Sequence, residues 1–176
     1  HFDGVSDRMD STSTLGDVVT ASAFEFAAVY LPDSLGADVV VSSSRNAEAI
    51  FTSGGAAPID MGITVQTSGV TVFVYNGSSY ASSGYAAISA GAASLITGRL
   101  DGGTLYARVG SGAEASGAAG GNISATTDTV RIGCNFNAGA FVDGKLATII
   151  ICNAVLSASE RASLRTYLAA KYAVTA

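Results

Sequence analysis

The last quarter of the chain, residues 130–172, constrains the fold most because it carries a marker at each expected boundary. Val130 and Ile132 alternate with polar neighbours, which predicts a half-buried strand. Asp143-Gly144 is typical of a tight hairpin turn, whose central residues need positive φ. Residues 146–152 are almost continuously apolar, as in a strand with both faces covered. We therefore expect a strand, a turn and a second strand ahead of a C-terminal helix.

The helix is predicted over about residues 158–172. Ser157 and Glu160 have the spacing of a capping box, in which each side chain binds a backbone amide at the helix start. One helical face then carries Leu164, Tyr167, Leu168, Lys171 and Tyr172. We expect the aromatic and aliphatic members of this face to pack onto a sheet.

Residues 21–31 show the clearest strand alternation upstream of this region. Phe24, Phe26 and Tyr30 share one parity, which predicts a half-buried strand facing the core. Glu25 lies on the other parity and is expected to face solvent.

Turn signals at close spacing predict many short strands. Asn76-Gly77 suggests a type I′ turn between strands at 70–75 and 78–82. Residues 101–103 (DGG) suggest a hairpin between 94–100 and 104–109. The small-residue segment 110–127 is expected to be an exposed loop.

These elements predict an all-β protein, a two-sheet antiparallel jelly-roll sandwich with one short C-terminal helix. The strands span about residues 2–152, and 176 residues suit a single domain over 1–176.

Four segments in the right order resemble one known fold family. Residues 141–172 (FVDGKLATIIICNAVLSASERASLRTYLAAKY) resemble the closing motif of laminin-G-like jelly rolls in the concanavalin A-like lectin and glucanase superfamily. Residues 1–7 (HFDGVSD) resemble its first strand, 95–106 its central hairpin and 130–133 its late strand. The resemblance implies a laminin-G-like domain of the kind found in bacteriophage virion and bacterial surface proteins. That superfamily includes lectins, hydrolases, adhesion modules and viral structural proteins, so the fold alone does not fix the function.

The residues expected of a hydrolase are missing from the sequence. Glucanases of this superfamily carry alternating carboxylates, Glu-x-Asp-x-Glu, on one strand. None of the four glutamates, at positions 25, 48, 114 and 160, has a carboxylate two or four residues away. Histidine occurs only at His1, so no internal imidazole can activate a nucleophile. We expect no catalytic residues and no enzyme activity.

Calcium binding stays open, because some laminin-G-like domains hold this ion through loop carboxylates. The candidates by residue type are Asp3, Asp7, Asp10, Asp17 and Asp128. They lack EF-hand spacing, so no metal ligand is assigned and no other cofactor is expected.

The two cysteines, Cys134 and Cys152, fall in the last two predicted strands. Spacing alone leaves open whether they form a disulfide or two free thiols.

Three tyrosines beside polar turn residues are the candidate ligand-binding residues. Tyr75, Tyr80 and Tyr85, with Asn76 and Asp60, could form a platform on which a sugar ring stacks while its hydroxyls form hydrogen bonds. The alternative is that each tyrosine is half packed at an end of the sandwich.

Charge and hydropathy restrict the partners. The net charge of −5 without a basic patch argues against nucleic acid as a partner, and no apolar run reaches the roughly 20 residues of a membrane helix.

The first hypothesis for the function is a non-catalytic surface, structural or attachment module, such as a bacteriophage head fibre, decoration or tail component. The second is a secreted or cell-surface carbohydrate-binding lectin, and the third is a degenerate glycoside hydrolase domain. The expected partners are other virion or cell-surface proteins, glycans or a second copy in a homo-oligomer, on a virion surface or outside the cell.

Overall fold

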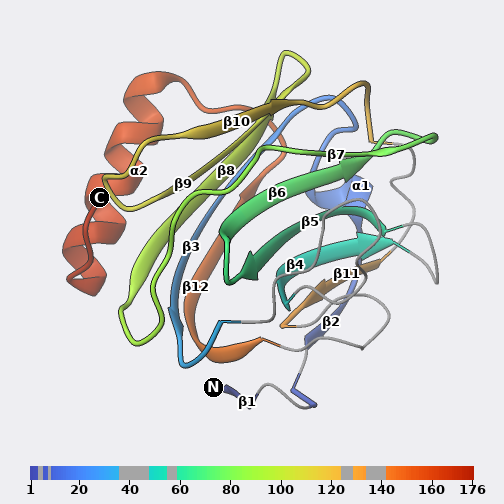
Figure 1. Ribbon diagram of the computed structural model, residues 1–176. Helices are drawn as coiled ribbons and strands as arrows, with labels where there is room; N and C mark the ends of the chain where they lie inside the picture. The colour runs from blue at the N-terminus through green and yellow to red at the C-terminus, as the bar shows by residue number, and fades with distance from the viewer. Residues whose placement is uncertain (4–5, 8, 36–47, 55–58, 124–128, 134–141) are drawn as a thin grey trace.

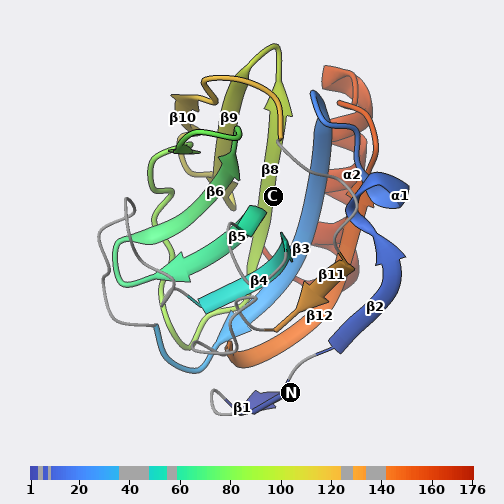
Figure 2. The same ribbon diagram turned by 90° about the vertical axis from the view of Figure 1, so that its right-hand side faces the viewer.

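The computed structural model describes residues 1–3, 6–7, 9–35, 48–54, 59–123, 129–133 and 142–176. Two antiparallel sheets face each other, and the C-terminal helix α2 lies on the outside of one of them (Figures 1 and 2). The first sheet has the order β1-β12-β3-β8-β9-β10, and the second has the order β2-β11-β4-β5-β6-β7. The predicted all-β antiparallel jelly-roll sandwich with one short C-terminal helix is confirmed.

The strands of the first sheet are β1 (Phe2–Asp3), β3 (Phe24–Pro32), β8 (Ser94–Asp101), β9 (Thr104–Val109), β10 (Ala115–Ala118) and β12 (Asp143–Cys152). Those of the second are β2 (Met9–Thr14), β4 (Glu48–Gly54), β5 (Ile59–Gln66), β6 (Gly69–Tyr75), β7 (Tyr80–Ser82) and β11 (Thr129–Ile132). The helices are α1 (Leu15–Val18) and α2 (Ala158–Tyr172).

The core fills the space between the two sheets. Val70, Val72 and Val74 of β6 are fully buried on one side, and the large side chains of β3, among them Phe26, are buried opposite them. Gly98 of β8 is the cross-strand partner of Phe26, and a Cβ at Gly98 would meet the Phe26 ring and a Val72 methyl. This glycine therefore leaves room for an aromatic ring between the sheets.

The hairpin between β8 and β9 matches its prediction. Asp101 pairs with Thr104, and the two loop residues Gly102 and Gly103 have φ of 55° and 79°. Two consecutive residues with positive φ are what a type I′ turn requires.

The predicted hairpin at Asp143-Gly144 is wrong. β11 pairs with β2 and β4 in the second sheet, whereas β12 pairs with β1 and β3 in the first. Gly144 lies inside the ladder opposite Pro32, where a Cβ would clash with the carbonyl oxygen of Leu31. The glycine is thus explained by a close backbone approach rather than by a turn.

The predicted type I′ turn at Asn76-Gly77 is also wrong. Tyr75 pairs with Tyr80, so the loop has four residues, and only Gly77 in it has positive φ, at 94°. Asn76 Oδ1 instead accepts hydrogen bonds from the backbone N–H groups of Ser78 and Ser79, both at 3.0 Å. An Asx turn therefore closes this loop.

The segment 110–127 is only partly the exposed loop expected from its composition. It contains β10, which pairs with β9, and Ala119 and Ile123 are buried in the core. Residues 124–127 lie outside the described part of the chain.

Candidate functional site

An aromatic cluster lies on the outer face of the second sheet, at the edge formed by β6 and β7. Because β6 alternates, its valines face the core while Phe73 and Tyr75 point outward. Tyr75 and its cross-strand partner Tyr80 have ring centroids 5.0 Å apart at 50°, and Phe73 meets Tyr80 edge-on at 6.0 Å. Tyr80 is 39% exposed. We call Phe73, Tyr75, Tyr80 and the loop 76–79 the tyrosine surface.

The loop beside these rings is held by its own hydrogen bonds. Asn76 Oδ1 accepts the two backbone bonds of the Asx turn and a third from Ser78 Oγ at 2.9 Å. The Tyr75 hydroxyl donates to the carbonyl oxygen of Gly77 at 3.1 Å. A Cβ at Gly120 would lie 2.9 Å from Asn76 Nδ2, so this glycine allows the neighbouring chain to approach the loop. Asn76 thus positions the loop beside the two tyrosines.

Tyr85 does not join this surface. Its neighbour Ala86 bridges to Val70, at the far end of β6 from Tyr75, and five residues of strand span about 17 Å. The Tyr85 hydroxyl donates to Gln66 Oε1 at 3.2 Å. The structure therefore brings Tyr75, Asn76 and Tyr80 together and leaves Tyr85 apart. The side chain of Asp60 lies outside the described part of the chain.

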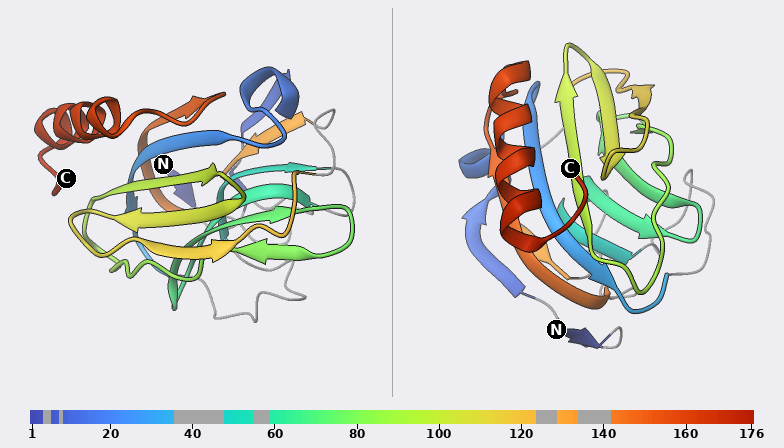
Figure 3. Two further views of the ribbon diagram at one scale, coloured as in Figure 1. Left: turned by 90° about the horizontal axis from the view of Figure 1, so that it is seen from above. Right: turned by 90° about the vertical axis from the view of Figure 1, so that its left-hand side faces the viewer.

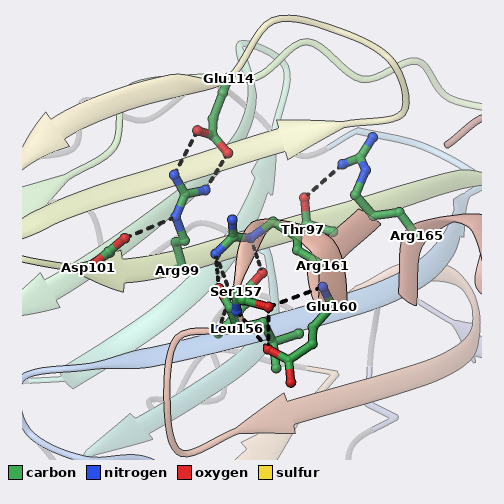
Figure 4. Close-up of polar contacts among 10 residues, drawn as sticks. Thr97, Arg99, Asp101, Glu114, Leu156, Ser157, Glu160, Arg161 and Arg165 are labelled. Carbon is green, nitrogen blue, oxygen red and sulfur yellow. Dashed lines mark hydrogen bonds and ion pairs between the residues drawn. The ribbon is translucent and has the colours of Figure 1, made fainter. Parts of the chain in front are cut away.

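A second polar cluster lies where α2 covers the outer face of the first sheet (Figures 3 and 4). Glu25 of β3 is only 3% exposed and accepts hydrogen bonds from Arg161 Nη2 and from the backbone N–H of Leu156, both at 2.9 Å. The hydrogen bonds to Glu25 raise the pKa of Arg161. The prediction that Glu25 faces solvent is wrong, because α2 covers the side of β3 that strand parity alone assigns to water.

The helix itself follows its prediction closely, with one exception. The Ser157–Glu160 capping box is present, and Leu164, Leu168 and Tyr172 pack with Ala27, Val29 and Leu95. Tyr167 was also expected to pack onto the sheet, but it is 56% exposed, and Lys171 Nζ lies 5.5 Å from its ring centre.

The glutamates whose side chains the structure describes all form hydrogen bonds or ion pairs with other residues. Glu114 binds Arg99 through both oxygens, with Arg99 also stacked 3.7 Å above the Tyr106 ring, and Glu160 accepts from the N–H of Ser157 at 2.9 Å. Glu25 is paired with Arg161. The side chain of Glu48 lies outside the described residues.

Two of the aspartates considered for calcium, Asp10 and Asp17, are bonded to different parts of the protein. Asp10 pairs with Arg131, and Asp17 accepts from the backbone N–H of Thr14 at 2.7 Å, which lowers the pKa of Asp17. In the described part of the chain no three His, Cys, Asp or Glu side chains come together as a metal site. Asp128 and the side chain of Asp3 lie outside that part.

Cys152 is a free, part-buried cysteine. Burial, and then the negative charge of Glu25, raise the pKa of its thiol. Cys134 lies outside the described residues.

No family model and no curated protein matches this sequence. Several solved structures share its fold. The LG4–5 domains of mouse laminin α1 superpose with a TM-score of 0.57 at 12% identity, covering 86% of this chain and 41% of that one. Domain 4 of AbnA, an extracellular arabinanase from Geobacillus stearothermophilus solved with arabinotriose, gives 0.62 at 12% identity, covering 93% and 86%. This chain has a laminin-G-like jelly-roll fold.

A third match is tailspike protein 2 of the Escherichia coli O157:H7 bacteriophage CAB120, with a TM-score of 0.60 at 12% identity. The match covers 95% of this chain but only 26% of the tailspike. Structural similarity at such low sequence identity shows only that the folds are alike. The activity has to be argued from the residues of the site. Among the described residues, no helix has the length and apolar character needed to cross a membrane.

Proposed function

We propose that this chain is a non-catalytic attachment module that binds glycans at the tyrosine surface, as part of a larger virion or extracellular protein. The observation that carries this proposal is the Tyr75–Tyr80 pair, placed outward at a sheet edge beside a polar loop. A tyrosine ring offers an apolar face to the C–H side of a sugar and a hydroxyl at its rim.

The loop next to the rings supplies the polar half of such a site. Gly77, Ser78 and Ser79 are exposed, and the bonds to Asn76 fix the loop before any ligand arrives. A preorganised loop avoids part of the entropy cost of ordering on binding. With two stacking rings and few fixed polar groups, we expect dissociation constants between about 1 μM and 1 mM.

Two of the structural matches support the context of this proposal. The AbnA domain, which this chain covers over most of its length, was solved with a bound oligosaccharide. The tailspike match favours a virion protein as the larger assembly, with this chain corresponding to about a quarter of it. The first match therefore supports a sugar as the ligand, and the second supports a virion protein as the setting.

The hydrogen bonds and ion pairs of the described glutamates support the proposal that the module is non-catalytic. A retaining or inverting glycosidase needs one carboxylate free to exchange a proton and another facing the sugar. Glu25 and Glu114 are instead bound by guanidinium groups, and Glu160 caps α2.

A glycan-array screen of the purified chain, run with calcium and again with EDTA, tests this function. Specific binding in both buffers supports a tyrosine-based sugar site. Binding abolished by EDTA would assign the ligand to a calcium site instead, and no binding in either buffer would leave the sandwich as scaffolding. Presence of the full-length protein in purified virions would support the virion context, and its absence from them would exclude it.

A further inference from the structure

Arg165 is a buried cation whose hydrogen-bond partners are neutral. It is 8% exposed, and its Nη1 donates to Thr97 Oγ1 at 3.2 Å while Nη2 donates to the carbonyl oxygen of Gly110 at 2.6 Å. It makes no ion pair with any residue in the described part of the chain. Buried arginines are normally paired with a carboxylate, because an isolated charge is costly to remove from water.

A second arginine beside it also donates to a neutral acceptor and lacks an ion-pair partner among the described residues. Arg108 of β9 is the cross-strand partner of Thr97 and donates from Nε to the same Gly110 oxygen at 3.2 Å. Among the described residues it also has no carboxylate within ion-pair distance. Burial, and then the positive charge of Arg108, lower the pKa of Arg165. Two like charges thus converge on one carbonyl oxygen, an arrangement that an anion would stabilise.

The two described glutamates on this face are each paired with another arginine. Glu114 binds Arg99, and Glu25 binds Arg161. Figure 4 shows Arg99 and its carboxylates on one side of Thr97 and the Arg165 guanidinium on the other. The charge of Glu114 partly offsets that of Arg165, but among the described residues no carboxylate lies within ion-pair distance of Arg108 or Arg165.

We propose that Arg108 and Arg165 form a binding site for one anionic group, a carboxylate or a sulfate, on the outer face of β8 and β9 beside α2. Both guanidinium groups keep N–H donors that these hydrogen bonds do not use, and such donors bind carboxylate and sulfate oxygens with charge-assisted hydrogen bonds. Arg108 is only part-buried, which gives a ligand access to it. The site is on a different sheet from the tyrosine surface and stands independently of the proposed glycan binding.

Arginine Nε–H resonances of the unmodified protein test the site directly by NMR. The probes are glucuronate, glucose 6-sulfate, acetate and inorganic sulfate, with glucose as the uncharged control. We expect saturable shifts at Arg108 and Arg165 with an anion, and no shift at Arg131, which pairs with Asp10 on the second sheet. Tighter binding of glucuronate or glucose 6-sulfate than of acetate or inorganic sulfate would identify an acidic sugar as the ligand. Equally tight binding of acetate or inorganic sulfate would identify a free anion as the ligand. Either result supports the site.

Arg108→Gln removes one positive charge from the site. The matched control, Lys145→Gln, removes one positive charge from an exposed position on β12. Affinity for the best probe should fall at least tenfold in Arg108→Gln and stay within about twofold in Lys145→Gln. No saturable shift with any anion at about 10 mM would overturn the proposal. Undiminished affinity in Arg108→Gln would overturn it as well.

Discussion

Glu25 of β3 and Arg161 in the first turns of α2 form a two-point ion pair between residues 136 positions apart. The same carboxylate accepts the backbone N–H of Leu156, whose carbonyl oxygen in turn accepts from Arg161 at 2.8 Å. One buried side chain therefore fixes both the chain entering α2 and the helix itself on the sheet.

Glu25→Gln should lower the free energy of unfolding by about 2–4 kcal/mol. Breaking a buried pair costs about 3–5 kcal/mol, and the cost is reduced here because the Arg161 side chain keeps 21% of its surface exposed. Urea denaturation followed by circular dichroism measures the change. The matched control is Asp10→Asn, which removes the pair with Arg131 where the aspartate is 48% exposed and should cost less than about 1 kcal/mol. Equal losses in the two variants would contradict a structural role for the buried pair.

Gly98→Ala should destabilise the protein by about 1–3 kcal/mol, because the added methyl overpacks the core. Its Cβ would lie 2.5 Å from a Val72 methyl and against the Phe26 ring. In a Phe26→Leu background the same substitution should cost less, since the smaller side chain frees space. A double-mutant cycle by urea denaturation measures this coupling, and identical costs in both backgrounds would show that the ring is not the obstacle.

The α2 capping box should make stability depend on pH in acid. Hydrogen bonds from Ser157 lower the pKa of Glu160 from its ordinary value of 4.5. Because the folded value is the lower one, the stabilisation from ionised Glu160 is present above pH 4.5 and is lost as the pH falls through the folded pKa. The difference in unfolding free energy between the wild type and Glu160→Gln should therefore be constant near neutral pH and shrink in acid.

Removing the donor tests the cause of that shift. In Ser157→Ala the pKa of Glu160, followed by NMR, should move back toward 4.5, and loss of the cap should cost about 1 kcal/mol. A Glu160 pKa that is the same in both proteins would contradict the capping account.

Cys152 should react slowly with thiolate-specific reagents. Burial and the charge of Glu25 raise the pKa of its thiol above the ordinary 9.0, and only the thiolate is nucleophilic. In a Cys134→Ser background, the rate of alkylation should reach half its maximum above pH 9.0, and Glu25→Gln should lower that midpoint. A midpoint below 9.0 with Glu25 present would be inconsistent with the structure.

The features that the sequence predicts well are local ones. The capping box at Ser157, the hairpin at residues 101–104 and the alternation of β6 depend on neighbours within a few positions, so propensity and periodicity identify them. The fold as a whole is predicted from the resemblance of the closing segment to laminin-G-like domains.

The errors arise where distant segments decide the outcome. Glu25 is buried by a helix more than a hundred residues later, and Gly144 is needed by the backbone of β3 rather than by a turn. The small-residue segment around β10 carries no strand periodicity, yet pairing with β9 makes it a strand. For the candidate site, the sequence predicted one group of Tyr75, Asn76, Tyr80 and Tyr85, and the structure brings the first three together but leaves Tyr85 apart. The sequence also carries no signal that Arg108 and Arg165 lie together, because strand pairing and the packing of α2 bring them to the same carbonyl oxygen.

The most direct test of the proposed function is a calorimetric titration of the best array glycan into the wild type, Tyr80→Ala and Tyr167→Ala. Both tyrosines are exposed, at 39% and 56%, but only Tyr80 belongs to the tyrosine surface. We predict that Tyr80→Ala weakens binding at least tenfold, by the loss of about 1.4 kcal/mol or more, and that Tyr167→Ala binds as the wild type does. Equal affinity in all three proteins would contradict glycan binding at the tyrosine surface.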